Sequence, residues 1–433
     1  MQDFLWGVGT SAYEIEGAFD VGKKGRSVLD NLAHSVSLIK DGTNGDQGAD
    51  FFHSFHEDIL LLKELGVNSF RFSLSWPRII TDGKSEVSQF GLNFYSQVID
   101  ELIANGIEPI ICIYDWDMPA VLAIEGGLLS PEMPKWFAFY TETVVKAFGD
   151  RVKKWITFRD PEIAIGGGIY KGLFIPWLKL KTPLLSLALK NFFYLHAAAS
   201  KIIKDNCKDG LVGIGSYAEG ILPNTKKKED VKKLQEIYFA QNQDNILTTP
   251  PLFMDAIFLK EVNKQYRSLL QIENVKDERA FLKKINSVTD FIALDIFSSY
   301  VNNGQPPNPN LTFSSDLQAA NSLYWVCKFF YQRYNVPLLI NGTGINTFQE
   351  GVHDKTRIEY LKRCLTSLDK LKQEKVQLIG FCHWSFLDGF EMQDGYSAQY
   401  GLVSVDRKTM AREKKDSFNF YKEAISQEEK HNG

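Results

Sequence analysis

Charged side chains stand at or just beyond the ends of several short apolar runs in this 433-residue chain. Asp115 lies near the end of PIICIYDW, and the neighbours Arg159 and Asp160 end KWITFRD. Asp295 lies in the second half of DFIALDIF, and Glu14 follows shortly after FLWGVGT. Carboxyl groups that a fold brings together can divide the roles of acid and base between them. Whether these groups meet depends on the elements that carry them.

Eight apolar runs of strand-like composition recur along the chain and alternate with amphipathic stretches of helical period. Continuous apolar strands that alternate with helices indicate a parallel sheet covered on its outside. Eight such units predict a closed (β/α)8 TIM barrel of the α/β class rather than an open sheet with a glycine-rich phosphate turn. The expected strands are residues 4–10, 69–76, 109–116, 154–160, 211–217, 290–297, 337–344 and 376–386.

In such a barrel the ligand site lies at the carboxyl ends of the strands, so we expect the charged residues to converge there. Residues 1–426 are expected to form one barrel domain. The segment 218–289 is too long for a single helix and is interpreted as an insertion that carries extra helices. Residues 427–433 are polar and are expected to form a frayed tail.

Composition and charge exclude several classes of protein. The net charge is −4 and the pI is near 6.0, which does not fit a nucleic-acid-binding surface. The five cysteines are scattered without CxxC spacing, so we expect neither a disulfide framework nor a zinc site, and no other cofactor. No run approaches the ~20 apolar residues of a membrane span. The N-terminus lacks the pattern of a signal peptide, which predicts a cytoplasmic protein as written, or an extracellular one if a leader has been removed.

Five ordered blocks of the sequence resemble glycoside hydrolase family 1, the β-glucosidase-like barrels. Residues 4–17, FLWGVGTSAYEIEG, resemble the family's F-x-W-G-x-A-T-S-A-Y-Q-x-E-G. Residues 70–78, FRFSLSWPR, resemble Y-R-F-S-I-S-W-x-R, and residues 114–119, YDWDMP, resemble Y-H-W-D-L-P. Residues 384–391, WSFLDGFE, and 395–406, GYSAQYGLVSVD, resemble W-S-L-L-D-N-F-E-W and G-Y-S-x-R-F-G-L-x-x-V-D. The resemblance implies a TIM barrel that hydrolyses β-glycosides with retention through two glutamates, an acid/base and a nucleophile.

Both glutamate positions implied by this resemblance hold other residues. The family's acid/base motif T-x-N-E-P corresponds to TFRDP, in which Arg159 replaces the Asn and Asp160 replaces the Glu. The nucleophile motif P-x-x-I-T-E-N-G corresponds to residues 337–344, PLLINGTG, which places Gly342 on the nucleophile position. Shifting the alignment to match the N-G pair places Ile340 there instead. Neither alignment supplies a carboxylate.

The rest of the implied sugar pocket is altered in part. Glu14 replaces a sugar-binding Gln, Asp115 replaces a His, and Asp295 with the following Ile replaces the Asn-Tyr pair that orients the nucleophile. Asp388 and Asp406 are interpreted as hydrogen-bond acceptors within loops rather than as ligands of a substrate. The positions that the resemblance retains, although some of them can serve as packing at the barrel mouth, are Arg71, Trp116, Trp384 and Glu391.

These replacements have direct chemical consequences. A glycine has no atom that can attack an anomeric carbon, so the covalent route of a retaining enzyme is removed. Asp160 is one methylene shorter than Glu, and we expect Arg159 to hold it ionised and thereby unable to act as an acid. The new acids Glu14, Asp115 and Asp295 are expected mainly to pair with arginines. An alternative is that one of them activates a water in a single-step, inverting reaction.

Three functional hypotheses follow from these residues. The first is a catalytically inactive barrel that binds a glycan or a protein partner, similar to the klotho and lactase-like branch of the family. The alternative is an active β-glucosidase-like hydrolase of carbohydrate metabolism with a rebuilt site, a role that the fold alone does not establish. A third hypothesis is a diverging paralogue without a selected activity. The sequence leaves the ligand, the partner and the oligomeric state open.

Overall fold

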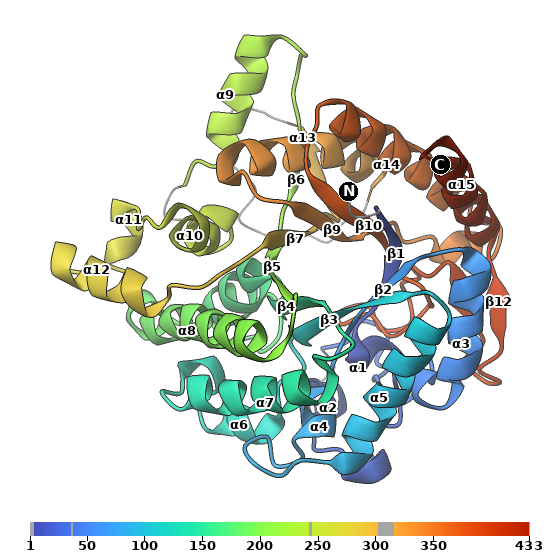
Figure 1. Ribbon diagram of the computed structural model, residues 1–433, viewed down its shortest axis with the longest axis horizontal. Coiled ribbons are helices and arrows are strands. Elements are labelled where there is room, and N and C mark those ends of the chain that lie inside the picture. Colours follow the sequence, from blue (N-terminus) through green and yellow to red (C-terminus); the bar gives the residue numbers. More distant parts are fainter. Residues whose placement is uncertain (1–3, 36–37, 242–244, 302–315, 433) are drawn as a thin grey trace.

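Eight parallel strands close into a barrel at the centre of the molecule (Figure 1). The structure is a computed structural model and describes residues 4–35, 38–241, 245–301 and 316–432. The predicted single-domain (β/α)8 barrel is confirmed, and each expected range overlaps one barrel strand, although β3 begins one residue before its range. In order around the barrel the strands are β1 (Leu5–Gly9), β2 (Ser69–Ser73), β3 (Glu108–Tyr114), β4 (Lys154–Phe158), β5 (Leu211–Tyr217), β7 (Phe291–Asp295), β9 (Leu338–Thr343) and β10 (Leu378–Trp384), which pairs again with β1.

Side chains from the strands fill the inside of the barrel as a compact core. Because the carboxyl ends of the parallel strands meet above this core, residues at those ends are brought together from distant parts of the chain. Cys112 and Cys382 belong to the core, as their apolar surroundings in the sequence predict, and all five cysteines are buried and free. The buried cluster consists of Leu5, Ile110, Cys112, Ile156, Phe291, Ala293, Leu339 and Cys382.

Helices surround the barrel and bury one apolar face each against the strands (Figure 1). In α3 (Phe51–Leu65) the buried residues Phe51, Phe55, Ile59 and Leu62 recur at three- and four-residue spacing, the pattern of an amphipathic helix. The other large helices of this layer are α5 (Gln89–Ala104), α7 (Met133–Phe148), α8 (Thr182–Asn206), α13 (Leu317–Tyr334), α14 (Lys355–Gln373) and α15 (Asp416–Asn432). Residues 427–432, which we expected to form a frayed polar tail, instead continue α15, and Gly433 lies outside the described residues.

The segment between β5 and β7 carries extra elements outside the barrel. A short strand within it, β6 (Gly220–Leu222), pairs in parallel with β8 (Ser299–Val301), which follows β7. Figure 1 shows α9 and α12 at the periphery of the molecule. The helical elements of the segment are α9 (Lys228–Tyr238), α10 (Pro250–Met254), the π-helix η4 (Asp255–Leu259), α11 (Lys264–Arg267) and α12 (Val275–Lys284).

Short elements in the connections after the strands build the carboxyl end of the barrel. They include α1 (Ala12–Ile15), η1 (Val21–Lys23), α2 (Val28–Ser35), α4 (Trp76–Ile79), α6 (Ala120–Ile124), η2 (Gly127–Leu129), the π-helix η3 (Glu162–Lys171), η5 (Phe348–Glu350), and the antiparallel pair β11 (Val403–Val405) and β12 (Arg412–Lys414). In the described part of the chain, every helix is too short or too polar to cross a membrane.

Candidate active site at the carboxyl end of the barrel

Arg159, the residue after β4, lies at the centre of a buried group of charges. Its Nε donates a hydrogen bond to Asp295 Oδ2 at 3.0 Å. Its Nη1 donates to Asp115 Oδ1 at 3.2 Å and to Ser11 Oγ at 3.0 Å. These partners come from β7, the end of β3 and the end of β1. The barrel therefore gathers two aspartates around one guanidinium, whose planar donors suit paired carboxylates.

Two indole rings pack against the same guanidinium. The Arg159 guanidinium carbon lies 4.4 Å from the ring centroid of Trp384 and 5.5 Å from that of Trp116. Trp116 Nε1 also donates a hydrogen bond to the carbonyl oxygen of Arg159 at 3.2 Å. Cations over aromatic faces are stabilised by the ring quadrupole. Arg159 thus occupies the space between the indoles and the aspartates.

Arg71, on β2, supports the same acids from the other side. Its Nη1 lies 3.4 Å from Asp115 Oδ2 and donates to the Thr10 carbonyl oxygen at 2.7 Å. Its Nε donates to Asn341 Oδ1 at 3.0 Å, and Asn341 Nδ2 donates to Asp295 Oδ2 at 2.9 Å. The two arginines and two aspartates therefore form one continuous network through Asn341.

The predicted pairing of new acids with arginines is confirmed for Asp115 and Asp295. Burial by itself would raise the pKa of Asp115, but Arg159 and Arg71 together lower it below its ordinary value. Glu14 differs, because within the described residues its carboxyl takes part in no ion pair. Two of the three acids are therefore committed to charge pairing.

Asp295 fills the space beside Gly342, the glycine of β9. A Cβ built on Gly342 would lie 2.4 Å from Asp295 Oδ1, 3.4 Å from Phe297 Cζ and 3.5 Å from Trp384 Cε3. The first of these distances is far inside van der Waals contact. A side chain at position 342 therefore requires the carboxylate of Asp295 to move.

The surroundings of Asp160 favour its protonated form, which corrects the expectation that Arg159 keeps it ionised. Burial and the negative charge of Asp295 raise the pKa of Asp160 well above its ordinary range, against the opposing effect of Arg159. Arg159 Nε lies 3.4 Å from Asp160 Oδ2 but 3.0 Å from Asp295 Oδ2, so its charge is directed mainly to Asp295. The neighbouring charge of Asp295 and the loss of water therefore favour the protonated form of Asp160.

The backbone at two of these positions adopts an unusual conformation. Trp116 has φ of 66° and Asp160 has φ of 45°, in the left-handed region that non-glycine residues rarely use. Such residues cost of order 1–3 kcal/mol each and persist where their surroundings fix them. Both residues contact Arg159 here, and the sequence carried no signal for this strain.

A small cavity remains above Arg159. Its volume is about 70 Å³, which is below the range of about 300–1,000 Å³ typical of small-molecule sites. Arg71, Asp115, Asp160, Asp295 and Gly342 lie in the buried layer beneath it rather than on its wall. The lining residues are Glu14, Trp116, Arg159, Phe174, Phe297, Trp384, Glu391, Met392, Gln393, Asp394 and Tyr400.

The two glutamates on the cavity wall hold their protons unusually tightly. Burial, and next the charge of Glu391, raise the pKa of Glu14 well above its ordinary range. Burial raises the pKa of Glu391 to about 8, although a hydrogen bond with Trp384 and the charge of Arg159 oppose the shift. Both shifts favour the protonated forms of these two carboxyl groups.

A second cavity of about 340 Å³ lies beside the first, and Trp116 lines both. Its wall is mainly apolar and is formed by the connection after β3, the π-helix η3 and α2. Representative lining residues are Tyr114, Met118, Leu128 and Ile169. The size lies within the range of small-molecule sites.

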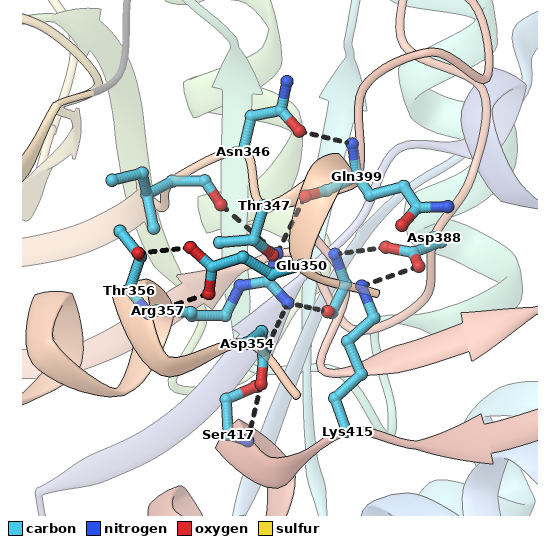
Figure 2. A network of polar contacts seen from close by, with 12 residues as sticks. Asn346, Thr347, Glu350, Asp354, Thr356, Arg357, Asp388, Gln399, Lys415 and Ser417 are labelled. Atoms are coloured by element: carbon cyan, nitrogen blue, oxygen red, sulfur yellow. Dashed lines mark hydrogen bonds and ion pairs between the residues drawn. The ribbon is translucent and has the colours of Figure 1, made fainter. Parts of the chain in front are cut away.

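A buried polar network joins the connection after β9 to the loop that carries Glu391 (Figure 2). Arg357, on α14, pairs with Asp354 at 2.7 Å and donates to Thr347 Oγ1 at 2.6 Å and to the Gln399 carbonyl oxygen at 2.8 Å. Asp388 in the same loop accepts from the Gly401 amide at 2.8 Å. These contacts fix the segment 388–401 against the barrel.

Three further acids, Asp388, Asp406 and Glu162, lie outside the cavity wall. Asp388 pairs with Lys415 at 2.7 Å, and Asp406 accepts from the Thr409 amide at 2.8 Å, so both are the loop acceptors that we expected. Glu162 is bound to the end of β5, where it accepts from Ser216 Oγ at 2.8 Å and from the Tyr217 amide at 3.0 Å.

Sequence reasoning missed Ser11 and Phe297 as parts of the site, and did not assign a role to Asn341. Ser11 donates to Asp115 Oδ2 at 2.7 Å and accepts from Arg159. Ser11 lies in the opening block that resembles family 1, and this position was a signal by which the sequence could have identified it. Phe297 lies two residues beyond β7 and faces Trp384, with ring centroids 6.1 Å apart. Nothing in its sequence context distinguished it from core aromatics.

Comparison with known proteins shows which family has this sequence and fold. Residues 1–430 match the model of glycosyl hydrolase family 1. The chain belongs to that family. It is 34% identical over 444 residues to β-glucosidase A of Thermotoga maritima, covering 98% of this chain and 97% of that protein. It is also 30% identical to a 6-phospho-β-galactosidase of Clostridium acetobutylicum, covering 99% and 97%.

Solved structures of family 1 show the same barrel. A Thermotoga maritima β-glucosidase in complex with deoxynojirimycin aligns with a TM-score of 0.86 at 31% identity, covering 98% of each chain. The fold of the family therefore extends over nearly the whole chain. Within that fold, the ends of β4 and β9 carry Asp160 and Gly342.

Proposed function

We propose that this family 1 protein recognises a β-linked carbohydrate at the carboxyl end of its barrel and does not hydrolyse it by the retaining route. Family membership and the named glycosidase relatives support a carbohydrate ligand. The indole of Trp116, which lines both cavities, suits contact with a sugar face. An apolar aglycone would find room in the neighbouring 340 Å³ cavity that shares Trp116.

The observation that carries the second half of the proposal is the pair Gly342 and Asp295. The position that the family resemblance assigns to the nucleophile has no side chain, and Asp295 fills the adjoining space. Asp295 is itself held by Arg159 at 3.0 Å and by Asn341 at 2.9 Å, which stabilises it as a structural anion rather than a free nucleophile. Arg159 also fills the space in front of Trp384.

Hydrolysis by a rebuilt site is the second candidate, and the relatives favour it, since those named above are a β-glucosidase and a 6-phospho-β-galactosidase. The raised pKa of Asp160 favours the proton that a general acid needs, and Asp115, whose pKa is lowered, could activate a water. A single-step reaction of this kind needs two carboxyl groups about 6.5–9.5 Å apart. It would also require Arg159 to leave the pocket.

One set of measurements separates the two candidates. The purified chain is incubated with a panel of aryl β-glycosides, and with a 2-deoxy-2-fluoro glycoside that traps a retaining nucleophile. Binding of the same glycosides is followed by tryptophan fluorescence. We expect quenching or enhancement on binding, no release of aryl alcohol above background, and no covalent label.

Two results would change the conclusion. Stoichiometric labelling of a carboxylate by the fluoro-glycoside would identify a replacement nucleophile and establish retaining hydrolysis. Turnover without labelling, with the opposite anomer as first product by NMR, would establish the single-step hydrolase. In the absence of hydrolysis, a receptor-like role of the klotho kind stays a prediction, tested by binding to glycans or candidate partner proteins.

A further inference from the structure

The acids at the carboxyl end of the barrel outnumber its basic groups. Three of these acids, Glu14, Asp115 and Asp295, stand where the resemblance to family 1 has neutral side chains. Arg159 and Arg71 are the cations that face them. The acids that meet here are Glu14, Asp115, Asp160, Asp295 and Glu391.

Glu14 is the member of this group with a buried carboxyl that faces open space. Its side chain is on the wall of the 70 Å³ cavity, and the residue is only 5% exposed. None of the described residues donates a hydrogen bond to its carboxyl. A buried carboxyl without a donor is costly unless a ligand or water supplies one. Glu14 therefore marks a place for a hydrogen-bond donor.

We propose that the cavity between Glu14 and Glu391 binds the ammonium group of a small cationic ligand, such as an amino sugar. This inference rests on the proposed function, because the ligand would enter the same end of the barrel, and it names the chemical class of sugar. Glu14 and Glu391 would accept the N–H donors. The rings of Trp116 and Trp384 would face the cation or the sugar.

Arg159 provides the precedent within the molecule for a cation in these surroundings. Its guanidinium lies 4.4 Å from the centroid of Trp384 and pairs with Asp115 and Asp295 directly below the cavity. An ammonium in the cavity would meet the carboxyls of Glu14 and Glu391, whose attraction must outweigh the repulsion by Arg159 on the same wall. The 70 Å³ volume suits a compact head group while Arg159 remains in place.

Protonation gives this binding a distinctive signature. The charged groups that face Glu14 are Glu391, Arg159, Asp115 and Arg71, and Asp394 and Asp388 also act on Glu391. Burial raises the pKa of both glutamates, that of Glu391 to about 8, so their protonated forms are favoured in the empty cavity. A bound ammonium stabilises the carboxylate form, so binding expels a proton. Binding of a neutral sugar is not expected to release a proton.

The test is titration calorimetry of the full chain with propylamine, glucosamine and glucose, in two buffers of different ionisation enthalpy. We expect both amines to bind with release of up to about one proton per site at pH 7, and glucose to bind more weakly without release. Affinity for propylamine, which stays charged throughout, should rise about tenfold per pH unit from pH 6 to 8 and then level off. Tighter binding of glucosamine than of propylamine would assign the site to amino sugars, and the reverse to simple amines.

Two variants locate the site. Glu14→Gln keeps the side-chain size and removes the charge, and we expect it to weaken both amines by roughly tenfold or more and to reduce proton release. Glu391→Gln should act in the same direction and serves if the first variant folds poorly. Glu142→Gln, on the exposed face of α7, is the matched control and should change neither quantity.

The outcomes separate this inference from the proposed function when an aryl β-glucoside is titrated in parallel. If the neutral glucoside binds and the amines do not, or if Glu14→Gln leaves amine affinity unchanged, the cation site is wrong and the proposed function stands. If the amines bind with proton release and neutral glycosides do not, the cation site stands and the proposed function fails. Equal affinity for glucose and glucosamine would overturn the inference.

Discussion

The carboxylate of Asp295 lies where a side chain on Gly342 would begin, since a Cβ at position 342 would come within 2.4 Å of Asp295 Oδ1. The two residues face each other across the paired strands β7 and β9. Placing a glutamate at position 342 is therefore not a simple restoration of a missing group. It would set two carboxylates against each other in a buried site.

Gly342→Glu by itself should destabilise the protein and create no hydrolysis. Overpacking of a dense core costs about 1–3 kcal/mol, and a second buried carboxylate beside Asp295 adds to that cost. The measurement is urea unfolding together with an aryl β-glucoside assay. The triple variant Gly342→Glu, Asp295→Asn and Asp160→Glu should recover part of the lost stability. Measurable turnover in the single variant would show that Asp295 moves aside easily, against this account.

Asp160 and Asp295 should respond differently to replacement by asparagine. The raised pKa of Asp160 favours its neutral form, so Asp160→Asn removes no charge and should change the free energy of unfolding by less than about 1 kcal/mol. Asp295→Asn leaves Arg159 without its nearest carboxylate and should cost several times more. If both variants lost the same free energy of unfolding in chemical denaturation, the negative charge would be shared between Asp160 and Asp295 rather than held by Asp295.

Removal of Arg159 should be the most destabilising single change in the site. Arg159→Met leaves Asp115 and Asp295 buried with reduced compensation, and breaking a buried pair from one side costs about 3–5 kcal/mol. Adding Asp295→Asn to Arg159→Met should restore much of this loss, because Asp115 then keeps Arg71 as its counter-charge at 3.4 Å and neither Asp115 nor Arg71 is left unpaired. The midpoint of urea unfolding measures the stability of the single and the combined variant. A lone Arg159→Met variant as stable as the native chain would contradict the central role of this guanidinium.

Glu162 should make the protein less stable as the pH rises. Burial raises its pKa to about 8, against hydrogen bonds from its own backbone, Ser216 and Tyr217. Between the unfolded pKa of about 4.3 and about 8, the folded state keeps a proton that the unfolded state has lost. The free energy of unfolding therefore falls with increasing pH, by up to about 1.4 kcal/mol per pH unit from this group, and levels off above pH 8.

Glu162→Gln isolates that contribution. The variant has no titrating group at this position, so its stability relative to the native chain should increase steadily between pH 5 and pH 8 and stay constant above. Urea unfolding at half-unit pH steps measures the difference. Glu142→Gln, at an exposed position on α7, should follow the native curve. A difference between Glu162→Gln and native that does not vary with pH would show that Glu162 is ionised in the folded protein.

Much of the architecture could be predicted because its signals are local. Each apolar run such as PIICIYDW carries its own strand pattern, and eight runs alternating with helices specify a barrel. The same logic placed Asp115, Arg159 and Asp295 at strand ends. The predicted direction of the shift in the Asp160 pKa was wrong. The sequence shows only Arg159 as a charged neighbour, whereas Asp295, which competes for that arginine, is 135 positions further along the chain.

The sequence by itself determined the fold, the family resemblance and which residue types stand at each strand end. Only the tertiary structure decided that Arg159 lies between the aspartates and Trp384, that Asp295 fills the space beside Gly342, and that Glu14 faces the cavity without a donor. The physical reason is that electrostatic coupling and close packing depend on distance in space. Barrel closure brings together side chains that are more than a hundred residues apart, and no local pattern records their contact.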